Sequence, residues 1–142
     1  MAKIRVTLRW IQIKDQLEPF YKQLFKQYGE FFFHTRVETG NQIVEFRLPE
    51  EGHWEISDHP RFNKVDKIDQ VMFEGEPGPS LTVQLFGEEL DRFSKNDQLD
   101  PYRKEFTGPP EEWVGRHAPG DEGSDDPENL ANWRICYDIE MA

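Results

Sequence analysis

Apolar and polar residues alternate along residues 4–13, as in a strand that is buried on one face. The apolar residues fall on even positions from Ile4 to Trp10 and on odd positions at Ile11 and Ile13. A β-bulge near Trp10 and Ile11 would accommodate this change of register, because a bulge inserts one extra residue into a strand. The pattern therefore predicts one long strand with a bulge in its second half.

The segment that follows has helical spacing. Asp15 suits the N-cap, Glu18 stands three residues later as a capping-box partner, and Gly29 suits the exit from a helix. The apolar residues recur every three or four positions and form one stripe: Leu17, Phe20, Tyr21, Leu24 and Tyr28. The spacing predicts a short amphipathic helix over about residues 15–28, inserted between two strands.

Several shorter segments also alternate, and a Gly40–Asn41 turn between the first two of them predicts a β-hairpin. Short strands separated by turn signals indicate an all-β fold, an antiparallel β-sandwich. The length of 142 residues fits a single domain over residues 1–142. The predicted strands cover residues 31–37, 43–48, 54–56, 68–73, 81–86 and 133–139.

The region between Asp97 and Asn132 shows little periodicity and is predicted to be a long loop region near the C-terminus. It contains an acidic loop over about residues 107–130, within which residues 120–129 read GDEGSDDPEN. This composition has few residues that can enter a core, so we expect a mobile acidic segment there.

The net charge of the chain limits the kinds of partner that it can bind. The formal net charge is −11, and eleven Lys/Arg against ten Asp/Glu in residues 1–67 leave all of the excess in residues 68–142. Such a field repels phosphate backbones, so nucleic acid is excluded as a partner, whereas cations and basic protein surfaces are favoured.

We expect a cytoplasmic protein, for three reasons. The chain has one cysteine, Cys136, it shows no secretory leader, and it has no apolar run long enough to span a bilayer.

The most specific string lies directly after the apolar segment LTVQLF. Residues 89–97 read Glu-Leu-Asp-Arg-Phe-Ser-Lys-Asn-Asp. A loop that folds back can aim the carboxylates of Glu89, Asp91 and Asp97 at one point, where a hard cation such as Ca²⁺ takes about six to eight oxygen ligands. The string resembles the third calcium-binding loop of C2 domains, in which acidic residues flank an Arg-Phe-Ser-Lys core.

The C2 resemblance implies a Greek-key β-sandwich that binds Ca²⁺ through acidic residues of two loops. In that family the earlier loop follows the first strand, where Asp15 matches by position, and Glu30 ahead of the aromatic strand is the nearest equivalent of a further ligand. In calcium-dependent members, aromatic or basic loop tips enter a membrane, and Phe93 and Lys95 could serve that way here. The metal ligands that the resemblance implies are Asp15, Glu30, Glu89, Asp91 and Asp97.

Each of these features also has a purely structural interpretation. Asp15 is explained as a helix cap, and residues 89–97 as a solvated turn whose local ion pairs are worth under about 1 kcal/mol each. His53 with Asp58 and His59 could ligate zinc, but exposed loop histidines are commoner. A membrane partner is expected only in a calcium-dependent form, because no surface cluster of basic residues is evident.

Trp113 stands in the acidic loop beside Glu111 and Glu112, where an exposed indole would make a docking surface for a basic protein partner. The alternative is that Trp113 and Trp133 anchor the loop to the sandwich. No constellation combines a nucleophile or base with an orienting partner, so we expect no enzyme. The sequence predicts a non-catalytic, calcium-responsive binding module, or else a metal-free interaction or assembly subunit that uses its acidic, Trp-bearing loop.

Overall fold

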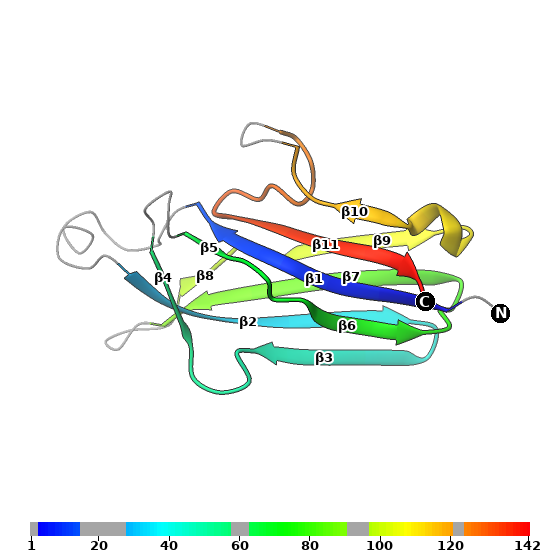
Figure 1. Cartoon of the computed structure of the whole chain (residues 1–142), viewed down its shortest axis with the longest axis horizontal. Coiled ribbons are helices and arrows are strands. Elements are labelled where there is room, and N and C mark those ends of the chain that lie inside the picture. Colours follow the sequence, from blue (N-terminus) through cyan, green and yellow to red (C-terminus); the bar gives the residue numbers. More distant parts are fainter. Residues whose placement is uncertain (1–2, 15–27, 58–62, 91–96, 121–123) are drawn as a thin grey trace.

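The alternating segments form two antiparallel β-sheets that pack face to face around an apolar core (Figure 1). The structure, a computed structural model, describes residues 3–14, 28–57, 63–90, 97–120 and 124–142. The predicted all-β architecture of antiparallel sheets is therefore confirmed.

The five-stranded sheet has the order β10-β11-β1-β5, and β6 also pairs with β1. Its first strand carries the predicted bulge, because the register between β1 and β11 shifts between Leu8 and Trp10. This shift lets both halves of β1 turn their apolar residues toward the core. The strands are β1 (Ile4–Ile13), β5 (Lys64–Val65), β6 (Gln70–Gly75), β10 (Gly115–His117) and β11 (Trp133–Met141).

The six-stranded sheet has the order β3-β2-β7-β8, with β4 beside β2 and β9 beside β7. The predicted hairpin joins β2 to β3, and its closing residues Thr39 and Gln42 are paired across the turn. Gly40 has a φ of +55°, a conformation that glycine adopts at no steric cost. The strands are β2 (Tyr28–Thr39), β3 (Gln42–Leu48), β4 (Trp54–Ser57), β7 (Ser80–Glu89), β8 (Asp97–Gln98) and β9 (Tyr102–Thr107).

Of the residues in the predicted helix over residues 15–28, the structure describes only the last one, Tyr28. Tyr28 begins β2, so the C-terminal end of that prediction was wrong. Residues 15–27 lie outside the described part of the chain.

The region between Asp97 and Asn132 is more ordered than its sequence indicates. It contributes β8, β9 and β10, together with a 3₁₀ helix, η1 (Pro110–Trp113). The sequence pattern of β9 indicates a strand only weakly, because only Tyr102 and Phe106 face the core and charged residues lie between them. The expectation of a mobile segment at residues 120–129 is likewise corrected in part, since Glu128 is buried.

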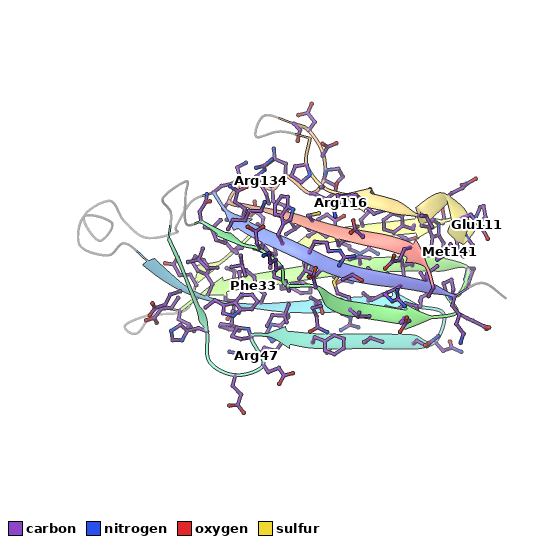
Figure 2. The ribbon with its side chains drawn as sticks, viewed as in Figure 1. Phe33, Arg47, Glu111, Arg116, Arg134 and Met141 are labelled. Carbon is purple, nitrogen blue, oxygen red and sulfur yellow. The ribbon has the colours of Figure 1, made fainter. Side chains whose placement is uncertain are left out.

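Large aromatic side chains fill one end of the core. Phe33 of β2 points between the sheets (Figure 2), where its ring stacks on Trp133 of β11 with centroids 5.7 Å apart. Phe31 stacks on Phe33 from the same strand, and Trp54 of β4 lies 5.9 Å from Phe33. Few but bulky residues thus supply the packing, which agrees with the high aromatic content of 13%.

A buried hydrogen-bond network holds the acidic loop against the sandwich. The Tyr102 hydroxyl lies 2.6 Å from a carboxylate oxygen of Glu128 and 2.6 Å from the Tyr137 hydroxyl. Burial raises the pKa of both tyrosines well above the ordinary value of 10, so they act only as neutral hydrogen-bonding groups. Glu128 is 4% exposed, and Lys104 approaches its carboxylate at 3.9 Å.

His117 at the end of β10 packs beside this network. Its ring stacks on Tyr137 with centroids 5.1 Å apart, and Nε2 lies 2.9 Å from the Trp113 carbonyl oxygen. Burial is the main cause that lowers the pKa of His117 below its ordinary value of 6.5, and the positive charge of Lys104 adds to it. The folded state therefore favours the neutral imidazole.

This lowered pKa makes stability depend on pH. The contribution is fully present above pH 6.5 and is lost as the pH falls toward the folded pKa, because the unfolded chain takes up the proton first. We expect urea unfolding between pH 7.5 and 5 to show a steeper loss of stability in the wild type than in His117→Phe. The variant His34→Gln, which keeps the buried imidazole, should retain the wild-type slope; equal slopes for His117→Phe and wild type would contradict the prediction.

Candidate functional site

Acidic residues from distant parts of the chain meet at one end of the six-stranded sheet. The strand register sets Glu30 of β2 opposite Glu55 of β4, and Glu89 of β7 opposite Asp97 of β8. Phe31 is the direct neighbour of Glu89 across β2 and β7, and the Leu90 amide donates to the Glu30 carbonyl oxygen at 2.8 Å. Three of the sequence-predicted ligands, Glu30, Glu89 and Asp97, therefore occupy adjacent strand positions.

The Glu89 side chain belongs to the inner side of this sheet, which faces the other sheet. It is 1% exposed and lies opposite the buried Phe31. It also closes the space over Gly29, where an added Cβ would lie 2.9 Å from Oε2 of Glu89 and 2.5 Å from the Phe31 ring. A side chain at position 29 would thus displace either the carboxylate or the ring.

Glu30 belongs to the outer side of the same sheet, because successive residues of a strand point to opposite faces. Its carboxylate lies 3.8 Å from Nε2 of His53, and Glu30, His53 and Glu55 can bring one ligand atom each within 4.8 Å of one another. The structure therefore brings the backbones of Glu30 and Glu89 together but places their carboxylates in two separate groups.

The other predicted site residues fall where the structure gives no side chain. Asp15, Asp91 and Phe93 lie outside the described residues, as do Lys95, Asp58 and His59. Asp97 is placed only by its register position opposite Glu89. Of the residues considered for zinc, His53 is described, and the side chains beside it are those of Glu30 and Glu55.

Trp113 does not present an indole to solvent. It is 2% exposed, and its Nε1–H donates to the Thr107 carbonyl oxygen at 2.9 Å. Trp133 is fully buried and donates in the same way to Asp100 at 2.6 Å. Both indoles anchor the loop region, so the expectation of a docking surface built on an exposed Trp113 is corrected. The acidic residues Glu111 and Glu112 beside it are exposed.

The group of Glu30, His53 and Glu55 could not be found from local pattern. Glu55 sits on a strand of only four residues, and nothing in its neighbourhood indicates that β4 pairs with the start of β2. The only signal is the alternation in Trp54-Glu55-Ile56, which predicts that Glu55 faces away from the core. Pairing between strands, a non-local property, decides its neighbours.

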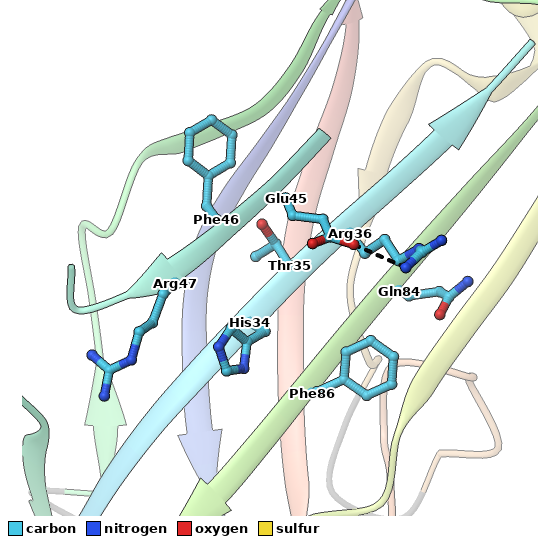
Figure 3. A pocket seen from close by; sticks show the side chains of 8 residues that line it. All are labelled: His34, Thr35, Arg36, Glu45, Phe46, Arg47, Gln84 and Phe86. Carbon is cyan, nitrogen blue, oxygen red and sulfur yellow. Dashed lines mark hydrogen bonds and ion pairs between the residues drawn. The ribbon is translucent and has the colours of Figure 1, made fainter. Parts of the chain in front are cut away.

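A shallow hollow of about 430 Å³ lies farther along the outer side of this sheet (Figure 3). Arg36 lines the hollow, and its guanidinium group donates to the carboxylates of Glu38 at 2.7 Å and Glu45 at 2.8 Å. Arg47 donates to the carbonyl oxygens of Pro49 and Gly52 and lies 4.6 Å from the centroid of the Phe32 ring. The two guanidinium groups are thus engaged within the chain. The hollow is lined by His34, Thr35, Arg36, Glu45, Phe46, Arg47, Gln84 and Phe86.

Comparisons with known proteins add no family to this geometry. Within the described residues, no helix has the length and apolar character that a membrane span requires. No protein-family model and no curated protein matches the chain.

Proposed function

We propose that this chain is a non-catalytic binding module with a C2-like architecture. In this proposal, acidic residues at one end of the six-stranded sheet bind Ca²⁺. The observation that carries the proposal is the strand register, which sets the acidic residue Glu89 of β7 directly opposite Asp97 of β8. Like charges directly opposite on neighbouring strands are destabilising. A bound cation would turn this repulsion into attraction, since hard cations prefer clustered carboxylate oxygens.

The chain connections at this end of the sheet support the same proposal. Asp91 follows Leu90, whose amide is bonded to the Glu30 carbonyl, and Asp15 follows Lys14 at the end of β1. Asp91 thus follows the strand that carries Glu89, and Asp15 follows the last strand residue of β1 by two positions. We propose that the calcium ligands are Glu89 and Asp97 together with Asp15 and Asp91. Glu30 belongs instead to the group of Glu30, His53 and Glu55 on the outer side of the sheet, called the outer group below.

A binding role without catalysis fits the environment of the single cysteine, Cys136. Cys136 is buried in β11, and burial raises the pKa of its thiol above the ordinary value of 9. Because the thiolate is the reactive form, this environment suppresses nucleophilic chemistry.

A metal-free interaction with a basic protein surface is the second candidate function. The buried Trp113 attaches η1 to the sandwich, and Glu111 (Figure 2) and Glu112 are exposed on this short helix. Exposed carboxylates held in this way favour encounter with basic partners, mainly through the association rate.

Thermal unfolding in EDTA, in millimolar Ca²⁺ and in millimolar Mg²⁺ tests the calcium proposal. A ligand that binds only the folded state should raise the midpoint by several degrees at a large excess over its dissociation constant. We expect a rise specific to Ca²⁺ that the double variant Asp91→Asn/Asp97→Asn loses. The matched control Glu105→Gln/Glu111→Gln removes the same number of charges elsewhere and should keep the rise.

A further variant separates the two acidic groups. Glu30→Gln/Glu55→Gln alters only the outer group and should leave the response to Ca²⁺ in place. Identical melting curves in all three solutions would overturn the calcium proposal and leave the metal-free candidate, to be tested by binding of a basic protein surface to wild type and to Glu111→Gln/Glu112→Gln.

A further inference from the structure

The β3 strand forms one edge of the six-stranded sheet and is paired on one side only. It runs along β2 without a register shift from Gln42 to Leu48, and no described strand pairs with its other side. Figure 1 shows β3 as the outermost strand of its sheet, projecting beyond β6 of the other sheet. An edge of this length leaves a row of backbone N–H and C=O groups available for pairing.

Edge strands usually carry lysine, proline or a bulge that discourages pairing with another chain. β3 contains no lysine or proline, and it exposes two large apolar residues, Ile43 at 57% and Phe46 at 39%. The opposite edge, β9, differs because Arg103, Lys104 and Glu105 follow one another along it. β3 therefore has the composition of a strand that another strand covers.

The hairpin turn decides which β3 residues offer their backbone groups to a partner. In a two-residue hairpin the closing residues, here Thr39 and Gln42, form a hydrogen-bonded pair, and such pairs then alternate along the strands. Positions 42, 44, 46 and 48 therefore bond to β2. Positions 43, 45 and 47 direct their N–H and C=O groups toward the open edge.

The side chains of β3 are complementary to those of a second copy in one antiparallel register. When two β3 strands pair around Phe46, each Glu45 lies opposite Arg47 of the second copy, and the two Phe46 rings meet at the centre. Val44 then meets Leu48. Pairing around Glu45 instead opposes two glutamates, and pairing around Val44 sets Ile43 against Glu45. Because opposite charges and aromatic pairs stabilise facing positions, the register around Phe46 is favoured.

The charged groups of this register retain bonding capacity. The Glu45 side chain is 58% exposed and accepts from Arg36, and a carboxylate can accept from a second guanidinium. Arg47 uses Nη1 and Nη2 for the Pro49 and Gly52 carbonyls, and a guanidinium has five N–H donors in all. Neither residue has to break a bond within the chain to reach the second copy.

We propose that two copies of this chain form a symmetric dimer through β3, paired antiparallel around Phe46. The pairing joins the two six-stranded sheets into one continuous sheet. It also covers Phe46, which otherwise leaves an apolar ring exposed at the sheet edge.

Sedimentation of the full chain over a range of concentrations tests the dimer. We expect a species of twice the 16.9 kDa chain mass. The single variants Glu45→Arg and Arg47→Glu place like charges opposite each other twice per dimer and should raise the dissociation constant roughly tenfold or more. The double variant Glu45→Arg/Arg47→Glu restores opposite charges and should recover the dimer, and the reversal Arg103→Glu/Glu105→Arg on β9 should not affect it.

Disulfide trapping supplies a second measurement that does not depend on charge. Opposed residues on antiparallel strands have Cα atoms about 4.5–5.5 Å apart, a distance that a disulfide can span. Phe46→Cys should therefore cross-link under mild oxidation, and Ile43→Cys should not. A chain that stays monomeric at millimolar concentration, a dimer that tolerates both single charge reversals, or equal cross-linking at positions 43 and 46 would overturn the proposal. Circular dichroism of each variant verifies that it is folded.

Discussion

Replacing Trp133 by alanine is expected to lower the free energy of unfolding by about 3–5 kcal/mol, the range for deletion of a large buried aromatic side chain. Trp133 is fully buried and stacks on Phe33 across the two sheets. Its indole N–H also satisfies the Asp100 carbonyl oxygen at 2.6 Å. The change removes packing and leaves that carbonyl without its donor, so the loss should be seen in urea unfolding at neutral pH.

Trp10→Ala is the matched control for this prediction. Trp10 is half-buried on β1 and lies under the Lys64 ammonium, 4.3 Å from the ring centroid. Its loss removes less buried surface and one cation–π contact, so the expected cost is about 1–2 kcal/mol. If Trp133→Ala cost no more than Trp10→Ala, the aromatic stack between the sheets would not be a main contributor to stability.

Replacing Glu128 by alanine is expected to cost about 1.5–3 kcal/mol, the range for a hydrogen bond that involves a charged group. The carboxylate accepts from the buried Tyr102 hydroxyl and lies near Lys104. Without it, the loop loses a side-chain attachment to β9. Urea unfolding measures the cost, and amide exchange at Ile135, whose N–H donates to the Glu128 carbonyl at 3.1 Å, reports on release of the loop.

Two variants separate the network from a general effect of lost charge. Glu128→Gln keeps an acceptor for Tyr102 and should cost less than Glu128→Ala. Glu105→Ala removes an exposed acid of β9 and should change stability by no more than about 0.5 kcal/mol. Equal costs for Glu128→Ala and Glu105→Ala would contradict the role assigned to the buried carboxylate.

Local periodicity was sufficient where a strand is long and has one buried face. The alternation of residues 4–13 and its inversion at Trp10 predicted both β1 and its bulge, and the Gly40–Asn41 signal predicted the β2–β3 hairpin. The strands at 81–86 and 133–139 were found for the same reason, although β7 and β11 extend a few residues beyond them. In such a strand every second side chain faces the core, so the apolar residues identify the buried face directly.

The same reasoning was insufficient for short strands with few apolar residues. β9 shows two core residues among charged ones, and β10 consists of Gly115, Arg116 and His117, which have no apolar alternation. Their position comes from neighbours, because β9 pairs with β7 and β10 pairs with β11. Burial of Trp113 was similarly left open, since an indole beside acids suits both an anchor and a docking residue.

For the candidate site, the sequence by itself determined which residues carry carboxylates near the ends of predicted strands, and the C2 resemblance implied Glu30, Glu89 and Asp97, with Asp15 and Asp91, as ligands of one metal ion. Only the tertiary structure decided that Glu30 opposes Glu55, that Glu89 opposes Asp97, and that the carboxylates of Glu30 and Glu89 belong to opposite faces of one sheet. The physical reason is that alternation along a strand is local, whereas the pairing partner and the register of each strand are set by contacts between residues far apart in the chain.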